Sequence, residues 1–203
     1  VIAVNSFVLG TTDGYVLCGF HSTDGETLLR RASLALHEAK RWSRGKLVLF
    51  GDHMEHQVRR RSKLETELRR ALEEGELIAV LQPQGSLATG ALVGAEALVR
   101  WRHPTMGMLP PAEFLAVARD CGLMRAIDQL MLGRAIDCIR VLQSEGFDIP
   151  VAINLSVESI ASPQTVENVA RALDGSGVAP RLLKVEVPED ALMRDVTAST
   201  QTL

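Results

Sequence analysis

The chain has 203 residues, of which 46% are hydrophobic and 23% charged, and its formal net charge is −3. This composition excludes a wholly disordered chain, and the slightly acidic balance gives no general attraction for a DNA or RNA polymer. The three cysteines form no CxxC pair. We therefore expect a reducing, cytoplasmic location, with a membrane anchor elsewhere in a parent protein left open.

The first part of the chain predicts a small α/β piece. A strand is expected at about residues 14–20, and the capping box Thr23-Asp-Gly-Glu26 predicts the start of a helix that runs to about Ser43. A short strand at 46–50 and a charged helix at about 54–75 follow. The basic run 59–63 in that helix is followed closely by glutamates, which favours a solvated, salt-bridged surface over a phosphate-binding tract.

From residue 76 onward, apolar segments with strand character alternate with segments of helical periodicity. Strands are predicted at 77–82, 92–101, 150–156 and 182–187, and helices at about 111–122, 124–145 and 163–175, with residues 106–108 in a loop. This alternation predicts a parallel α/β arrangement of the barrel type, without enough strands to close a barrel.

The segment Leu92 to Trp101 places a carboxylate and a guanidinium inside an apolar strand. Glu96, Leu98 and Arg100 share one face because strand side chains alternate. Buried charges need a partner, and one interpretation is a structural Glu96 and Arg100 pair that braces a core.

The next two strands favour a functional interpretation. Asn154 and Glu186 each lie near the C-terminal end of an apolar strand, the end that forms the functional face of an α/β barrel. With Glu96 they supply hard oxygen donors, which suit Mg²⁺, Mn²⁺ or Ca²⁺ better than Zn²⁺. The residues alone thus predict a divalent-metal hydrolytic site, with the structural interpretation still open.

Five ordered motifs resemble the EAL family, the bacterial phosphodiesterases that hydrolyse cyclic di-GMP. They are Gln82-Pro83, Gly94-Ala-Glu-Ala-Leu-Val-Arg-Trp-Arg-His-Pro104, Pro110-Pro-Ala-Glu-Phe114, Ala152-Ile-Asn-Leu-Ser156 and Val185-Glu-Val-Pro-Glu-Asp-Ala-Leu192. The resemblance implies an incomplete TIM-like barrel and hydrolysis of cyclic di-GMP to linear pGpG. It also implies a homodimer formed through the EAL domain.

Residues 28–50 are similar to the last helix and strand of a GGDEF, or diguanylate cyclase-like, domain, with Ser33, His37 and Ser43 departing from the usual pattern. The expected domains are a GGDEF tail at 1–52, a linker helix at 53–75 and a truncated EAL domain at 76–203. We expect a fragment of a tandem GGDEF–EAL protein, with a sensory or GGDEF domain in cis, that is inactive by itself.

The EAL resemblance also implies individual roles. The metal ligands for Mg²⁺ or Mn²⁺ are Glu96, Asn154 and Glu186, the catalytic residues are Glu96, Glu186 and Glu189, and the substrate-binding residues are Gln82, Leu98 and Arg100. Arg100 suits a phosphate oxygen through its planar set of donors.

Two positions depart from the family pattern: Pro188 replaces a usual threonine, and Leu81 replaces a usual aromatic residue. Two alternatives for the function also stay open. One is a module that binds cyclic di-GMP or a partner protein without cleavage, and the other is a regulatory role beside an active cyclase half.

Overall fold

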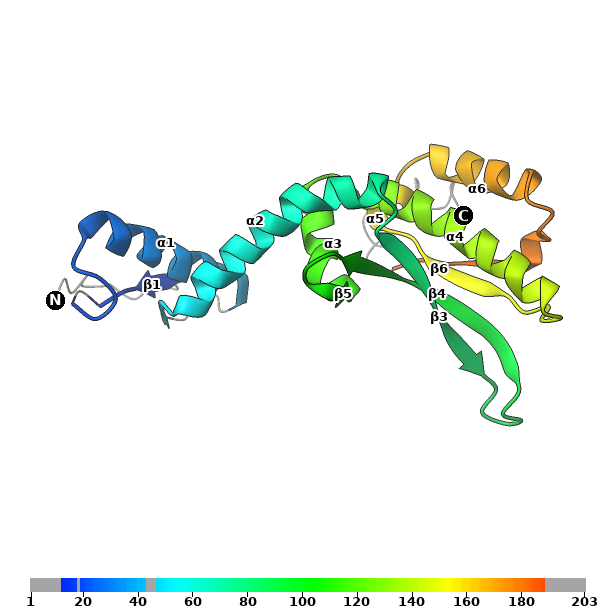
Figure 1. Ribbon diagram of the computed structural model, residues 1–203, viewed down its shortest axis with the longest axis horizontal. Helices are drawn as coiled ribbons and strands as arrows, with labels where there is room; N and C mark the ends of the chain where they lie inside the picture. The colour runs from blue at the N-terminus through cyan, green and yellow to red at the C-terminus, as the bar shows by residue number, and fades with distance from the viewer. Residues whose placement is uncertain (1–11, 18, 43–46, 189–203) are drawn as a thin grey trace. The chain divides into compact units, whose positions relative to one another are not determined.

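The computed structural model describes residues 12–17, 19–42 and 47–188 (Figure 1). The chain separates into two compact units, residues 1–63 and residues 64–203, and each is described by itself. Within the described ranges, every helix is too short or too polar to cross a lipid bilayer.

Unit 1 is a small α/β piece. Its strands β1 (Asp13–Tyr15) and β2 (Leu47–Leu49) pair in parallel, and helix α1 (Gly25–Trp42) connects them in the sequence. Gly14 lets β1 approach α1 closely, because a Cβ at this position would lie 2.0 Å from the backbone nitrogen of Leu36.

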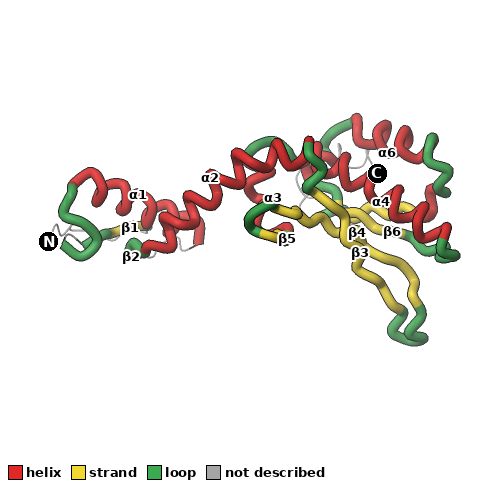
Figure 2. The backbone as a smooth tube through the Cα atoms, in the orientation of Figure 1, coloured by secondary structure: helices red, strands yellow, loops and turns green. Residues whose placement is uncertain are grey.

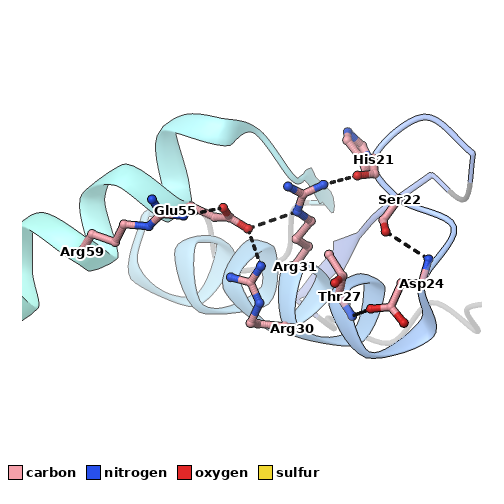
Figure 3. Close-up of polar contacts among 8 residues, drawn as sticks. All are labelled: His21, Ser22, Asp24, Thr27, Arg30, Arg31, Glu55 and Arg59. Carbon is pink, nitrogen blue, oxygen red and sulfur yellow. Dashed lines mark hydrogen bonds and ion pairs between the residues drawn. The ribbon is translucent and has the colours of Figure 1, made fainter.

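The start of α1 differs by one residue from the predicted capping box. The carboxylate Oδ2 of Asp24 accepts a hydrogen bond from the backbone nitrogen of Thr27 at 2.8 Å, so Asp24 caps the helix and not Thr23 (Figure 3). Either side chain can cap a helix. Which of the two side chains caps α1 depends on where the backbone enters the helix. Here Asp24 lies three residues before Thr27 and can accept from its backbone N–H. Hydrogen bonds from Thr27 also lower the pKa of Asp24.

An arginine cluster connects α1 to the beginning of helix α2 (Asp52–Glu73). The Glu55 carboxylate lies 2.9 Å from Arg30, 3.1 Å from Arg31 and 3.4 Å from Arg59 (Figure 3). Arg31 also donates to the carbonyl of His21, and its guanidinium stacks 5.0 Å from the centre of the Phe50 ring. The cluster therefore joins α1 to the start of α2, to the loop at His21 and to Phe50, the residue after β2.

Unit 2 is built on a mixed five-stranded sheet with the order β3-β4-β6-β7, to which β5 adds beside β4. Its strands are β3 (Leu77–Gly85), β4 (Leu92–His103), β5 (Gly107–Leu109), β6 (Val151–Asn154) and β7 (Leu183–Glu186). The pairs β4·β6 and β6·β7 are parallel, as predicted, whereas β3·β4 and β4·β5 are antiparallel. Among the described residues the sheet is open and forms no closed barrel.

The antiparallel pairs follow from short connections. Only residues 86–91 join β3 to β4, and a connection this short has no room for the crossover that parallel pairing needs. The prediction of a loop at 106–108 is wrong in part, since residues 107–109 form β5. These three residues turn back along β4 and pair with residues 101–103. A segment of three residues is too short for a hydrophobic period to predict this pairing.

Helices cover one face of this sheet (Figure 2). They are α3 (Pro111–Asp120), α4 (Met124–Ser144), α5 (Val157–Ile160), α6 (Gln164–Asp174) and the short 3-10 turn η1 (Pro180–Leu182). The short helix α5 was not predicted.

Alternation along β4 produces the core beneath these helices. Ala95, Ala97, Val99 and Trp101 are all buried, whereas Glu96, Leu98 and Arg100 on the other face are partly exposed. Trp101 is fully buried, packs edge-on to Phe114 at 5.7 Å, and donates its indole N–H to Glu76 at 2.8 Å. The apolar side of β4 therefore anchors the sheet, and the polar side lies on the opposite, open face.

The two described cysteines, Cys121 and Cys138, are free thiols. Burial, reinforced by the neighbouring Asp137, raises the pKa of the Cys138 thiol. A thiol of this kind stays protonated and is a poor nucleophile, in keeping with a structural role.

Candidate functional site

The strand register brings the predicted site residues onto one face of the sheet. Gln82 pairs with Glu96, Glu96 with Ala152, and Ala152 with Lys184, so these four residues form one row across β3, β4, β6 and β7. Directly paired residues point to the same side of a sheet. Because every second residue shares that side, the same face carries Leu98, Arg100, Asn154 and Glu186.

Two of the three predicted metal ligands are in direct contact. Asn154 Nδ2 lies 2.7 Å from Glu96 Oε1, although the two residues are 58 positions apart in the sequence. Asn154 is exposed and Glu96 is partly exposed, so the pair lies at the surface of the open face. Glu96 is therefore not fully buried, and among the described residues no helix covers its face of the sheet.

Glu186 completes the group as the register partner of Asn154 on the neighbouring strand. Its side chain is exposed, and its carboxylate makes no hydrogen bond or ion pair with any residue that the structure describes. The backbone beside it is well anchored, because Leu155 N–H donates to the Glu186 carbonyl at 3.1 Å. Glu186 therefore presents a carboxylate that has no hydrogen-bond or ion-pair partner among the described residues.

Glu96 is not at the end of its own strand, which continues to His103. It is the middle residue of the parallel ladder between β4 and β6, which covers residues 95–97 of β4. Of the three predicted donors, Asn154 and Glu186 are the last residues of β6 and β7, whereas Glu96 lies within β4, which extends further because β3 and β5 pair with the rest of the strand.

The structural interpretation of Glu96 and Arg100 finds no support among the described residues. Arg100 donates to the backbone carbonyl of Val99 at 2.9 Å, and the contact of Glu96 is with Asn154. No ion pair joins the two charged groups in the part of the chain that the structure describes. Arg100 therefore keeps donors available on the open face.

Lys184 is a member of this face that the sequence reasoning did not consider. It lies in the row of Glu96 and two residues before Glu186 on β7. Side-chain alternation along residues 182–187 was sufficient to place Lys184 on the same face as Glu186. It was not considered because a single lysine in a strand usually points to solvent. Glu189 lies outside the described residues, and Pro188 before it is exposed.

The donor set fits a hard divalent cation. Two carboxylates and one amide on adjacent strands offer oxygen ligands of the kind that Mg²⁺ and Mn²⁺ accept. The amide of Asn154 currently directs its nitrogen at Glu96, and rotation about its last bond would turn its oxygen to the same point. Groups of three or more His, Cys, Asp or Glu residues suited to a metal are absent from the described residues, so the amide is needed to complete the set.

Comparison with known proteins assigns the family. The model of the EAL domain matches residues 65–203. This chain belongs to the EAL family.

Two similar proteins come from Pseudomonas aeruginosa. The chain is 37% identical over 172 residues to the cyclic di-GMP phosphodiesterase NbdA, covering 84% of this chain and 22% of that protein. It is 34% identical over 180 residues to the bifunctional diguanylate cyclase/cyclic di-GMP phosphodiesterase MucR, covering 87% of this chain and 26% of that protein. The chain thus spans about a quarter of the length of these relatives.

A solved structure supports the fold assignment. The MucR phosphodiesterase in complex with cyclic di-GMP superimposes with a TM-score of 0.66 at 36% identity, over 70% of this chain and 57% of that one. The open α/β sheet of unit 2 is therefore the arrangement of part of an EAL domain.

Proposed function

We propose that this chain is part of a phosphodiesterase that hydrolyses cyclic di-GMP to linear pGpG with the help of a divalent cation. The observation that carries the proposal is the meeting of Glu96, Asn154 and Glu186 on one open face, with Asn154 and Glu96 2.7 Å apart, in a member of the EAL family. EAL domains generally depend on a divalent metal, and the donor set favours Mg²⁺ or Mn²⁺.

In this proposal Glu96, Asn154 and Glu186 hold the cation. When bound, a divalent cation lowers the pKa of a water molecule and neutralises charge on the attacked phosphate. Arg100 lies on the same face and binds a phosphate oxygen through its guanidinium. Gln82, across the strand pair from Glu96, and Leu98 contact the rest of the dinucleotide.

Glu189 is proposed as a further catalytic residue, since it follows Glu186 closely in the sequence. For residues 1–52 we propose the tail of a GGDEF-like domain. The length of the match with MucR supports this, because its 180 residues exceed the stretch that the EAL model covers and MucR is named as a diguanylate cyclase as well. Dimerisation through the EAL residues stays a prediction that light scattering can check.

The test uses the full-length protein, cyclic di-GMP and either Mg²⁺ or Mn²⁺, with the product separated by chromatography. We expect pGpG from the wild type and a loss of more than about a hundredfold in turnover for Glu96→Gln, which keeps the shape of the side chain but removes a charged ligand. Glu145→Gln, an exposed residue at the end of α4, is the matched control and should be unaffected.

Two outcomes would contradict the proposal. Undiminished turnover in Glu96→Gln would remove this residue from the mechanism. Binding of cyclic di-GMP by the wild type without any hydrolysis in either metal would favour the alternative of a receptor module.

A further inference from the structure

A buried carboxylate lies directly behind the metal-binding end of β6. Asp128, on α4, is only 6% exposed. Its Oδ2 accepts three hydrogen bonds, from the backbone nitrogen of Ser156 at 2.9 Å, from the Ser156 hydroxyl at 2.5 Å and from the Ser159 hydroxyl at 2.6 Å. A buried aspartate is retained only where donors of this kind satisfy it.

The serines that donate to Asp128, Ser156 and Ser159, come shortly after Asn154 in the sequence. Ser156 is two positions after Asn154, and Leu155 between them is buried in the core. The backbone here is anchored on two sides, since Leu155 N–H donates to Glu186 on β7 and Ser156 N–H donates to Asp128 on α4.

Ser156 and Ser159 complete the connection. The Ser156 hydroxyl donates to Asp128 and accepts from the backbone nitrogen of Ser159 at 3.2 Å, which caps the short helix α5. The turn between β6 and α5 is therefore held by hydrogen bonds to one atom, Oδ2 of Asp128. Charged acceptors make the stronger hydrogen bonds, so this carboxylate limits movement of the segment that follows Asn154.

We propose that Asp128 is a positioning residue that holds the Asn154 amide at the cation site through the backbone of residues 155 and 156. The inference rests on the function proposed above, because a fixed amide matters only if Asn154 is a ligand. Asp128 itself does not reach the open face, since it lies on α4 among the buried groups on the other side of the sheet. Its effect on the cation is transmitted by Asn154.

The test measures Mn²⁺ binding to the full-length protein by electron paramagnetic resonance, without substrate. We expect Asp128→Asn to weaken Mn²⁺ binding about tenfold, the size typical for residues that support a metal ligand. Asp137→Asn makes the same change at an exposed position of the same helix and should leave binding unchanged.

A combined variant separates positioning from a general structural role. In an Asn154→Ala background, Asp128→Asn should weaken binding by less than about twofold, because the group through which it acts is already absent. If Asp128→Asn does not fold, Ser159→Ala takes its place. It removes one of the three hydrogen bonds and should weaken binding about threefold in the wild type and not in the Asn154→Ala background.

The outcomes distinguish the two proposals. A wild type that binds no Mn²⁺ would overturn the proposed function and this inference with it. A wild type that binds Mn²⁺, combined with a variant that binds equally well or that loses the same factor in both backgrounds, would overturn the inference alone.

Discussion

Replacing Asn154 with aspartate tests the arrangement of the open face more sharply than removing the side chain. Asn154 Nδ2 lies 2.7 Å from Glu96 Oε1, and Asn154→Asp exchanges this donor for a second acceptor of negative charge. Two unit charges at about 4 Å repel by about 1 kcal/mol in water and about 4 kcal/mol near a protein surface. Because Asn154 is exposed, the lower part of this range applies.

Adding the lost hydrogen bond, worth about 1 kcal/mol, we expect Asn154→Asp to reduce the stability of metal-free unit 2 by about 2 kcal/mol at pH 7. The pKa of the introduced carboxyl is raised in the folded state by its negative neighbours. The loss is therefore complete above that raised pKa and disappears as the pH falls below the unfolded value near about 3.9. A bound cation should also reverse it, because two carboxylates then share a positive partner.

The assay is calorimetric unfolding of the full-length protein with a chelator and again with Mn²⁺, at pH 7 and at about pH 3.5, below the unfolded value of the introduced carboxyl. Asn168→Asp, the same change on helix α6, is the control and should respond to neither pH nor Mn²⁺ in this way. A destabilisation by Asn154→Asp that is independent of both pH and Mn²⁺ would refute the electrostatic reasoning and with it the shared site.

Two further predictions concern the packing of each unit. Phe114→Ala removes a fully buried ring that packs on Trp101 and should lower the free energy of unfolding by about 3–5 kcal/mol. Calorimetry of the unit 2 transition checks this. Phe147→Ala, at a side chain that is 48% exposed, is the control and should lower it much less. Glu55→Gln should destabilise α1 locally by about 1 kcal/mol, seen as faster amide hydrogen exchange, with Glu38→Gln as the control. The Arg31 hydrogen bond lowers the pKa of Glu55 against the opposing effect of burial, so this contribution is complete above about pH 4.3 and is lost as the pH falls through the lowered value. Equal exchange in Glu55→Gln and wild type at pH 7 would refute it.

Patterns within single segments were read correctly because they depend on local geometry. Alternation along residues 92–101 separated Glu96, Leu98 and Arg100 from the apolar residues that the structure buries. The helices at 111–120, 124–144 and 164–174 agree with their predicted positions within a few residues. Strand and helix periods are properties of the backbone itself, and the side chains record them directly.

Features that depend on the path of the backbone and on contacts between distant segments could not be predicted from the sequence. The capping by Asp24, the strand β5 and the antiparallel pairing of β3 depend on where the backbone turns and on which neighbour it meets. The Asp128 cluster was missed for the same reason: an aspartate on a helix and two serines after a strand are unremarkable until packing brings them to one oxygen atom.

The amino-acid sequence by itself determined which residues have chemistry to offer: the motifs of the EAL family and the side-chain types of Glu96, Asn154 and Glu186 are visible without coordinates. Only the tertiary structure decided that Asn154 contacts Glu96 across 58 positions, on a face of the sheet that no helix covers among the described residues. The physical reason is that residue type and period are local, whereas strand register is chosen by the packing of the whole sheet against its helices.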